Sequence, residues 1–226
     1  DFNVPLRDGK VSSDKRLTAS IRTIKYLRDN GAKVILMSHL GRPDGQVVPE
    51  LSLAPVAARL GELLGSKVRF VASSVGAEAK MAVSQLSDGD VLVLENLRFH
   101  KEETDNNEDF AKQLAALADL YVNDAFGTSH RAHSSMVGVD VKTRAAGLLL
   151  KKELEYFSRV LEAPTRPLTV VMGGAKVKDK IQLIYNMLDI VDEMISMISA
   201  QRAYEINSKT VKTVEEMMTM ANNLKR

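Results

Sequence analysis

The sequence predicts an α/β fold built on a doubly wound parallel sheet and followed by a long helical C-terminal segment. Short apolar runs alternate with amphipathic stretches through the first three quarters of the 226 residues. Several of these runs are continuously apolar, which is typical of strands buried on both faces of a parallel sheet. Strand, helix and strand repeated in this order indicate the doubly wound class.

The expected helices and strands alternate along the chain. The stretch from Leu17 to Asn30 has apolar residues at helical spacing and stops at Gly31, and the helix from Leu51 to Leu64 stops in the same way at Gly65. A third helix is expected from Asp109 to Ala118. The expected strands are Val34–Met37, Val68–Val71, Val91–Leu94, Leu120–Val122 and Leu168–Met172.

The last stretch differs from the rest of the chain. No Pro follows Pro167 and no Gly follows Gly174, so the pattern predicts one or two long helices. Packing in the core is the interpretation we favour, and a specialised binding tail is the alternative. An apolar stripe at helical spacing consists of Val211, Val214, Met218 and Ala221.

The charge balance and composition exclude several classes of protein. A net charge of +2, from 31 basic and 29 acidic residues, is too small for a polybasic protein of nucleic acids or membrane surfaces. No apolar run approaches the ~20 residues that span a bilayer. The chain lacks a basic-then-apolar leader, so we expect no signal peptide, although an opening without Met is compatible with a fragment. The absence of Cys excludes thiolate chemistry and fits a reducing, cytoplasmic compartment.

Basic residues follow four of the five expected strands at the point where each strand ends. Arg42, Arg98 and Arg131 follow three of them, and Lys176 follows the last one in the segment Gly173-Gly174-Ala175-Lys176. Because the carboxyl ends of parallel strands meet at one edge of a sheet, we expect these cations to converge on one crevice. Planar guanidinium groups grip two oxygens at once, so the predicted ligand carries phosphate and carboxylate groups.

Each of these features also has an interpretation without a ligand. Any single Arg can be a solvated residue or part of a local ion pair, and Gly173–Lys176 can be a turn that starts a helix instead of a phosphate cradle. Neither a P-loop nor a dinucleotide fingerprint is present. His130 and His133 favour a structural or anion-facing role over a metal site. The acidic run from Glu102 to Asp109 is expected to be a solvated loop and helix start.

Six motifs in these regions resemble signatures of the phosphoglycerate kinase family, in the family's order. The resemblance covers residues 1 to about 195. It implies two Rossmann-like domains, an N-terminal one that binds 3-phosphoglycerate in a basic patch and a C-terminal one that binds Mg-ADP or Mg-ATP. The motifs are Asp1–Pro5, Ser38–Pro43, Leu94–Phe99, Val122–Gly127, His130–Ser135 and Gly173–Val177.

The resemblance also implies roles for individual residues. Arg16 would steady the transferring phosphoryl group and Lys176 would reach it, so these two are the expected catalytic residues. The nucleotide would be bound by Gly173, Gly174, Lys176 and Lys180. The 3-phosphoglycerate site would consist of Asp1, Asn3, Arg16, His39, Arg42, Arg98 and Arg131.

The chain departs from the family at both ends. The family's opening strand, just before Asp1, is largely missing, so we expect the sheet to lack one strand. After Ile195 the segment Gln201–Ser208 resembles the C-terminal helix of bacterial flagellar rod proteins, especially the distal rod protein. We therefore expect a substrate domain at 1–167, the start of a nucleotide domain at 168–195 and a rod-like helical tail at 196–226.

Two functions follow from these expectations. The first is a phosphoglycerate kinase half that binds 3-phosphoglycerate but lacks efficient turnover, because phosphoryl transfer needs both substrates held in line. The second is a structural or assembly protein, or a non-catalytic chimera, in which the C-terminal helix drives self-association. In the alternative to self-association, the tail folds back and covers apolar surface of the kinase half.

Overall fold

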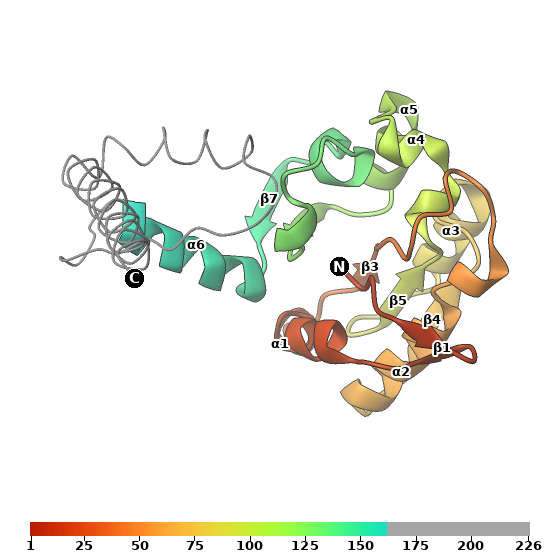
Figure 1. The fold of residues 1–226 in the computed structure, drawn as a ribbon, viewed down its shortest axis with the longest axis horizontal. Helices are drawn as coiled ribbons and strands as arrows, with labels where there is room; N and C mark the ends of the chain where they lie inside the picture. Colours follow the sequence, from red (N-terminus) through yellow and green to blue (C-terminus); the bar gives the residue numbers. More distant parts are fainter. Residues whose placement is uncertain (162–226) are drawn as a thin grey trace, which may run out of the picture. The chain divides into compact units, whose positions relative to one another are not determined.

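The computed structural model describes residues 1–161 (Figure 1). A compact unit spans Asp1–Tyr156, and the last described helix, α6 (Leu148–Leu161), continues past its end. The domain boundaries expected after residues 167 and 195, the helical tail and the strand at Leu168–Met172 all lie outside the described residues.

The strands of the described part form two separate parallel sheets. In the first, β3 (Val34–Leu36), β5 (Val91–Leu94) and β4 (Val68–Val71) pair in the order β3-β5-β4. In the second, β6 (Leu120–Asn123) pairs in parallel with β7 (Thr143–Ala146). The α/β class with parallel strands is confirmed. The expected strands are divided between two sheets among the described residues, because β3 pairs with β5 and not with β6.

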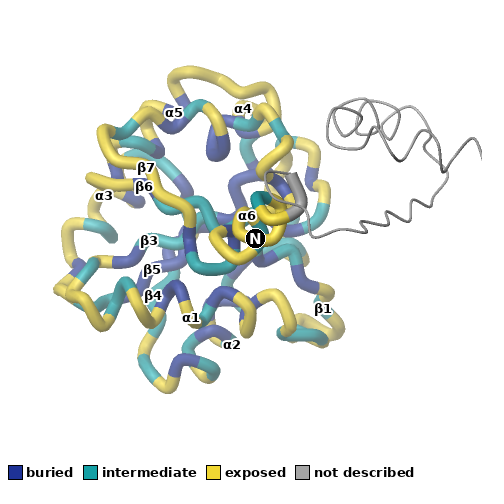
Figure 2. Tube along the Cα trace, turned by 90° about the vertical axis from the view of Figure 1, so that its left-hand side faces the viewer, coloured by how far each residue is buried: buried dark blue, intermediate teal, exposed yellow. Residues whose placement is uncertain are grey.

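Helices cover the three-stranded sheet on both faces because the side chains of β5 alternate between the two. Val91 and Val93 pack with α1 and α2, whereas Leu92 and Leu94 pack with residues of α3. All four side chains are buried, and burial of one such side chain stabilises the fold by roughly 1.5–3 kcal/mol. Figure 2 shows this buried strand inside a shell of more exposed elements.

The remaining elements lie close to their expected places or were not expected. The three predicted helices are confirmed as α1, α2 and α5, and Gly65 ends α2 with a φ of 65°. Helix α3 escaped prediction because it buries only Ala79, and β7 because its residues are exposed. The helices are α1 (Lys15–Asp29), α2 (Ala54–Leu64), α3 (Gly76–Ser84), α4 (Lys101–Thr104) and α5 (Glu108–Ala115).

Short elements connect the helices and strands of this framework. β1 (Leu6–Arg7) and β2 (Lys10–Val11) form a small antiparallel hairpin that was not predicted. Single turns of tighter or wider helix lie at Pro49–Leu51, Leu97–Phe99, Phe126–Thr128 and Ser134–Gly138. Among the described residues, no helix combines the length and the apolar character that crossing a bilayer requires.

Candidate anion-binding site

The loop after β5 is a buried polar corner that fixes its neighbours through hydrogen bonds. The Asn96 Oδ1 accepts from the N–H groups of Leu40 and Arg98, both at 3.1 Å, and its Nδ2 donates to the carbonyls of Leu40 and Leu51 at 2.7 and 2.9 Å. The Glu95 carboxylate accepts from Ser52 Oγ at 2.7 Å. These bonds tie the loop after β3 to the loop after β5, so both loops present their side chains at one edge of the sheet.

Gly41 connects the two loops at a position whose backbone conformation and close neighbour favour glycine. Its φ is +64°, and a Cβ there would lie 2.8 Å from a methyl carbon of Leu51. Its N–H donates to Asn3 Oδ1 at 3.0 Å, and its carbonyl accepts from Arg98 Nη1 at 2.9 Å. The backbone of Gly41 therefore fixes both Asn3 and the guanidinium of Arg98.

Two guanidinium groups at this edge hold buried N–H groups that are not hydrogen-bonded. Arg98 is 6% exposed, and its Nε and Nη2 have no partner among the described residues. The Nε of Arg131 is also buried and has no hydrogen-bond partner among the described residues. An unpaired buried donor costs about 1–3 kcal/mol, and more when it is charged, so this arrangement favours an anion that accepts these bonds.

The charges of several predicted site residues affect one another's pKa, which agrees with their lying near one another. Arg131 and Arg42 both lower the pKa of Arg98, although burial contributes more to that shift than either charge, and Glu103 and Asp44 oppose it. The guanidinium of Arg42 itself belongs to an exposed residue, so it extends the basic surface outward from Arg98.

His39 lies inside this group of cations and is held neutral. Its pKa is lowered to about 3, first by burial and then by the charges of Arg98, the chain's α-ammonium group, Arg131 and Arg16, in that order. Its Nδ1 lies 3.6 Å from the Asp1 carboxylate, which is too long for a hydrogen bond, and a neutral ring forms no ion pair there. The site therefore holds a neutral imidazole among several guanidinium groups.

Asp1 joins Arg16 to the same edge. An Arg16 Nη1 donates to the Asp1 carboxylate at 2.5 Å, and the N–H of Asn3 donates to the other carboxylate oxygen at 3.1 Å. The side chain of Arg16 is about half exposed at 52%, so this ion pair orients the guanidinium without contributing much stability.

Glu103 is the one residue that contradicts the expected solvated run from Glu102 to Asp109, since the other residues of the run are exposed. It is 3% exposed, and its carboxylate accepts from the Ser135 N–H at 3.0 Å and from the Ser135 Oγ at 2.5 Å. His133 Nδ1 lies 3.7 Å away. Burial raises the pKa of Glu103, although the Ser135 hydrogen bonds and the charge of Arg98 oppose the shift. Glu103 thus fixes the segment that follows Arg131.

Sequence reasoning missed Glu103 and Asn96 as contributors to this site. Ser135 lies 32 residues from Glu103, and Leu40 lies 56 residues from Asn96, so neither contact has a local signal. The polar pair directly after a wholly apolar strand is the one feature that could have indicated the Asn96 corner. The expected nucleotide residues Gly173, Gly174, Lys176 and Lys180 lie outside the described residues.

The fold and the site define the class of this chain, an α/β domain with basic side chains gathered at the carboxyl edge of parallel strands. The family model for phosphoglycerate kinase matches residues 1–224. The chain belongs to the phosphoglycerate kinase family. The match extends past residue 195, where the sequence resemblance was expected to end, and the likeness of the tail to flagellar rod proteins stays a prediction.

Relatives and solved structures agree with the family. Phosphoglycerate kinase of Euplotes crassus is 56% identical over 210 residues, and the match covers 86% of this chain and 50% of the relative. Phosphoglycerate kinase of Clostridium botulinum is 51% identical over 222 residues, and the match covers 93% of this chain and 56% of the relative. The structure of phosphoglycerate kinase from Coxiella burnetii superposes with a TM-score of 0.75 at 42% identity, over 85% of this chain and 48% of that one. The chain thus spans about half the length of the curated relatives it matches.

Proposed function

We propose that this chain is the 3-phosphoglycerate-binding half of a phosphoglycerate kinase, the cytoplasmic glycolytic enzyme that transfers a phosphoryl group between ATP and 3-phosphoglycerate. The observation that carries the proposal is the pair of guanidinium groups, Arg98 and Arg131, whose buried N–H groups lack partners among the described residues. Membership of the family supports the choice of a phosphorylated carboxylic acid as the ligand.

The geometry of Arg98 supports binding of two oxygens at once. Its Nη1 donates to the Gly41 carbonyl, while Nε and Nη2, which form one edge of the planar group, have no partner within residues 1–161. That edge matches the two oxygens of a carboxylate or phosphate. Arg131 would add a third donor, and Arg42 and the neutral His39 would complete the contacts with the ligand.

Arg16 is proposed to steady the phosphoryl group during transfer, because its ion pair with Asp1 places it beside the same edge. Catalysis of this reaction depends on positioning and on neutralising charge, so no covalent nucleophile is needed. The role of this chain's described residues is to bind and orient the acceptor.

The nucleotide would be bound by residues that lie outside the described part of the chain. Mg-ATP supplies the phosphoryl group when it is bound, and Gly173, Gly174, Lys176 and Lys180 would hold it. Among residues 1–161, no group of three or more His, Asp or Glu is placed to hold a metal ion. Because the chain spans about half the length of its relatives, we propose that it binds 3-phosphoglycerate but turns over inefficiently by itself.

Calorimetric titration of the chain with 3-phosphoglycerate tests the binding half of the proposal. We expect saturable one-to-one binding that Arg131→Ala weakens at least ~10-fold, because a charge-assisted hydrogen bond is lost. The matched control is Arg22→Ala on the exposed side of α1, which should bind like the unsubstituted chain. Absence of binding at millimolar ligand contradicts the proposal, and a coupled assay with family-like rates contradicts inefficient turnover.

A second proposal concerns the tail, outside the described residues, for which the apolar residues Ile198, Val211, Val214 and Met218 are the supporting observation. It gives the tail a flagellar-rod-like helix that associates with copies of itself. Light scattering on the full chain and on a chain ending at Ile195 tests it. A larger mass for the full chain supports association, and equal monomeric masses overturn it.

A further inference from the structure

The residues that follow Arg131 fold into one wide helical turn, Ser134–Gly138, which is bonded back to the Arg131 segment. The N–H of Met136 donates to the carbonyl of His133 at 2.9 Å. The Oγ1 of Thr128 donates to the Sδ of Met136 at 3.6 Å, and the carbonyl of Thr128 accepts from the N–H of Arg131 at 2.9 Å. Met136 is therefore connected to Arg131 through Thr128 as well as along the chain.

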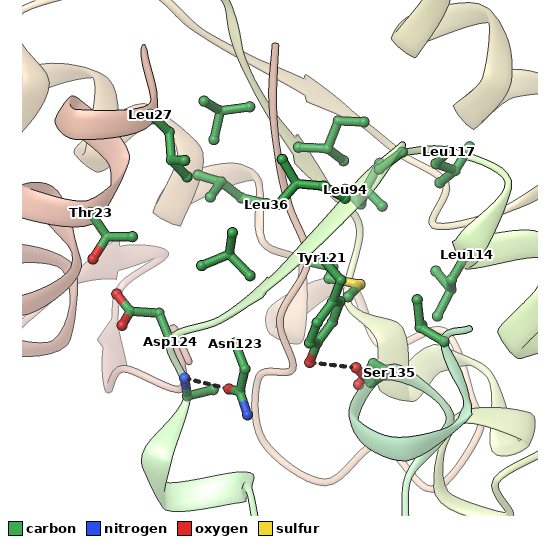
Figure 3. Close-up of a pocket in the computed structure, with 18 of the residues that line it drawn as sticks. Thr23, Leu27, Leu36, Leu94, Leu114, Leu117, Tyr121, Asn123, Asp124 and Ser135 are labelled. Carbon is green, nitrogen blue, oxygen red and sulfur yellow. Dashed lines mark hydrogen bonds between the residues drawn. The ribbon is translucent and has the colours of Figure 1, made fainter. Parts of the chain in front are cut away.

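Strands β6 and β7 also hold this turn. Tyr121 of β6 and Arg144 of β7 are partners in the parallel register, so their side chains lie on the same face of the two-stranded sheet. The Oη of Tyr121 donates to the carbonyl of Ser135 at 2.9 Å, as Figure 3 shows. The Nη2 of Arg144 donates to the carbonyl of Met136 at 2.7 Å. Two successive carbonyls of the turn thus accept hydrogen bonds, one from each strand.

The guanidinium of Arg144 makes two contacts at once because it is planar. Its edge donates to the turn, while its central carbon lies 4.9 Å from the centroid of the Tyr121 ring, which is a cation–π distance. Burial raises the pKa of Tyr121, and the charge of Arg144 opposes that rise, in agreement with the close approach. An ammonium group cannot present both a flat face and a donor edge, so this pair of contacts requires Arg.

The turn has a further support from α4, because the buried carboxylate of Glu103 accepts from the N–H and the Oγ of Ser135. Glu103 thus holds the second residue of the turn, whereas Arg144 holds the third, Met136. Met136 is the residue of the turn that accepts from Thr128. Loss of the Arg144 hydrogen bond should therefore loosen the contact that leads to the anion site.

We propose that Arg144 is a positioning residue, which fixes the segment that carries Arg131 through the Ser134–Gly138 turn and does not itself touch the ligand. The buried Nε of Arg131 has no partner among the described residues, and a group that binds a ligand works only when its supporting contacts hold it in place. The inference rests on the proposed function for the identity of the ligand, but the order of the Arg131 segment can be measured without a ligand.

Hydrogen exchange of the full chain without ligand is the first test. Arg144→Met removes the donor and the charge but keeps a long side chain, so we expect the Arg131 amide to exchange at least ~10-fold faster. The amide of Leu92 in the central strand should keep its rate, which distinguishes local loosening from general destabilisation. Arg144→Lys can donate to the turn but cannot stack on Tyr121, and should give an intermediate rate. An unchanged Arg131 amide, or equal acceleration at Leu92, overturns the proposal.

Calorimetry with 3-phosphoglycerate is the second test, because a merely structural Arg144 would not act through Arg131. Arg144→Met should weaken binding by about 3- to 5-fold, but should weaken it no further in a chain that already carries Arg131→Ala. The matched control is Arg69→Met in β4, since Arg69 also donates to a backbone carbonyl, that of Gln85 at 3.0 Å, and its loss should leave the affinity unchanged.

The outcomes separate this inference from the proposed function. Losses that multiply in the double variant overturn the route through Arg131. If the unsubstituted chain does not bind 3-phosphoglycerate, the proposed function fails, and the exchange rates alone decide whether Arg144 positions Arg131.

Discussion

Asn96 and Arg98 lie two residues apart in the same buried loop, yet their side chains differ in how many hydrogen bonds they make. The amide of Asn96 makes four hydrogen bonds to the loops around it. Within the part of the chain that the structure describes, the guanidinium of Arg98 makes one, to Gly41, and its Nε and Nη2 are unpaired. The contrast indicates that Asn96 holds the scaffold, whereas Arg98 is held by it and keeps one edge free for an anion.

The largest effect on folding is expected at Asn96. Asn96→Ala leaves buried backbone groups of Leu40 and Leu51 without partners, so the free energy of unfolding should fall by about 3–4 kcal/mol. Urea denaturation measures it. The control is Asn30→Ala, at the exposed end of α1, where the Nδ2 donates to a single carbonyl and the loss should stay below ~1 kcal/mol. Equal losses would contradict the assignment of Asn96 as the scaffold residue.

The reverse pattern is expected at Arg98. Arg98→Ala should weaken 3-phosphoglycerate binding by about 30- to 100-fold, while the free energy of unfolding falls by less than ~1 kcal/mol, because an unpaired buried charge is removed with the one hydrogen bond. Arg98→Lys keeps the charge but cannot present two parallel donors, so it should restore only part of the affinity. Calorimetry measures the loss of affinity and urea denaturation measures the loss of stability on the same samples. If Arg98 were purely structural, the substitution would lower the free energy of unfolding strongly and the affinity little.

A pH dependence follows from His39. Its pKa is about 3 in the folded chain, against 6.5 for an unperturbed His, so the unfolded chain binds the additional proton between these values. The contribution of His39 to the free energy of unfolding is therefore complete above pH 6.5 and is lost progressively as the pH falls toward 3. Unfolding free energies measured from pH 7 to 4 should fall less steeply in His39→Gln, and an unchanged slope would contradict the buried neutral His39.

The smallest effect is expected at Glu103. Glu103→Gln replaces one acceptor of the Ser135 hydrogen bonds with a donor, so the segment beside Arg131 loosens and 3-phosphoglycerate binding weakens by about 3- to 10-fold. Glu102→Gln, at the exposed neighbouring position, is the matched control and should not change the affinity. Equal affinity of both variants would remove Glu103 from the support of the site.

The sequence predicted those features of the fold that depend on neighbouring residues. Val91–Leu94 is continuously apolar and forms the buried central strand, and Gly65 ends its helix in the left-handed conformation. Arg42, Arg98 and Arg131 were expected at one edge because each follows a strand, and their mutual effects on pKa agree with that placement.

The sequence did not predict features that depend on contacts between residues far apart along the chain. Nothing near Glu103 indicates that a serine 32 residues further along buries it, so a solvated loop was expected. The resemblance led us to expect a sheet that lacks one strand, but the composition of β3 and β6 did not show which edges are left unpaired, because both runs are as apolar as inner strands. Local pattern fixes which residues form strands, and only the folded chain shows which edges are paired.

The central claim is that guanidinium groups distant in sequence are prepared to bind a phosphorylated acid. Its most direct test is the melting temperature of the full chain with and without 3-phosphoglycerate, measured in parallel for Arg98→Ala. A ligand that binds only the native state at ~100 times its Kd stabilises the fold by about 2.7 kcal/mol, which we expect as a rise of about 5–10 °C. The rise should be nearly absent in Arg98→Ala, and an unchanged melting temperature of the unsubstituted chain at saturating ligand would contradict the claim.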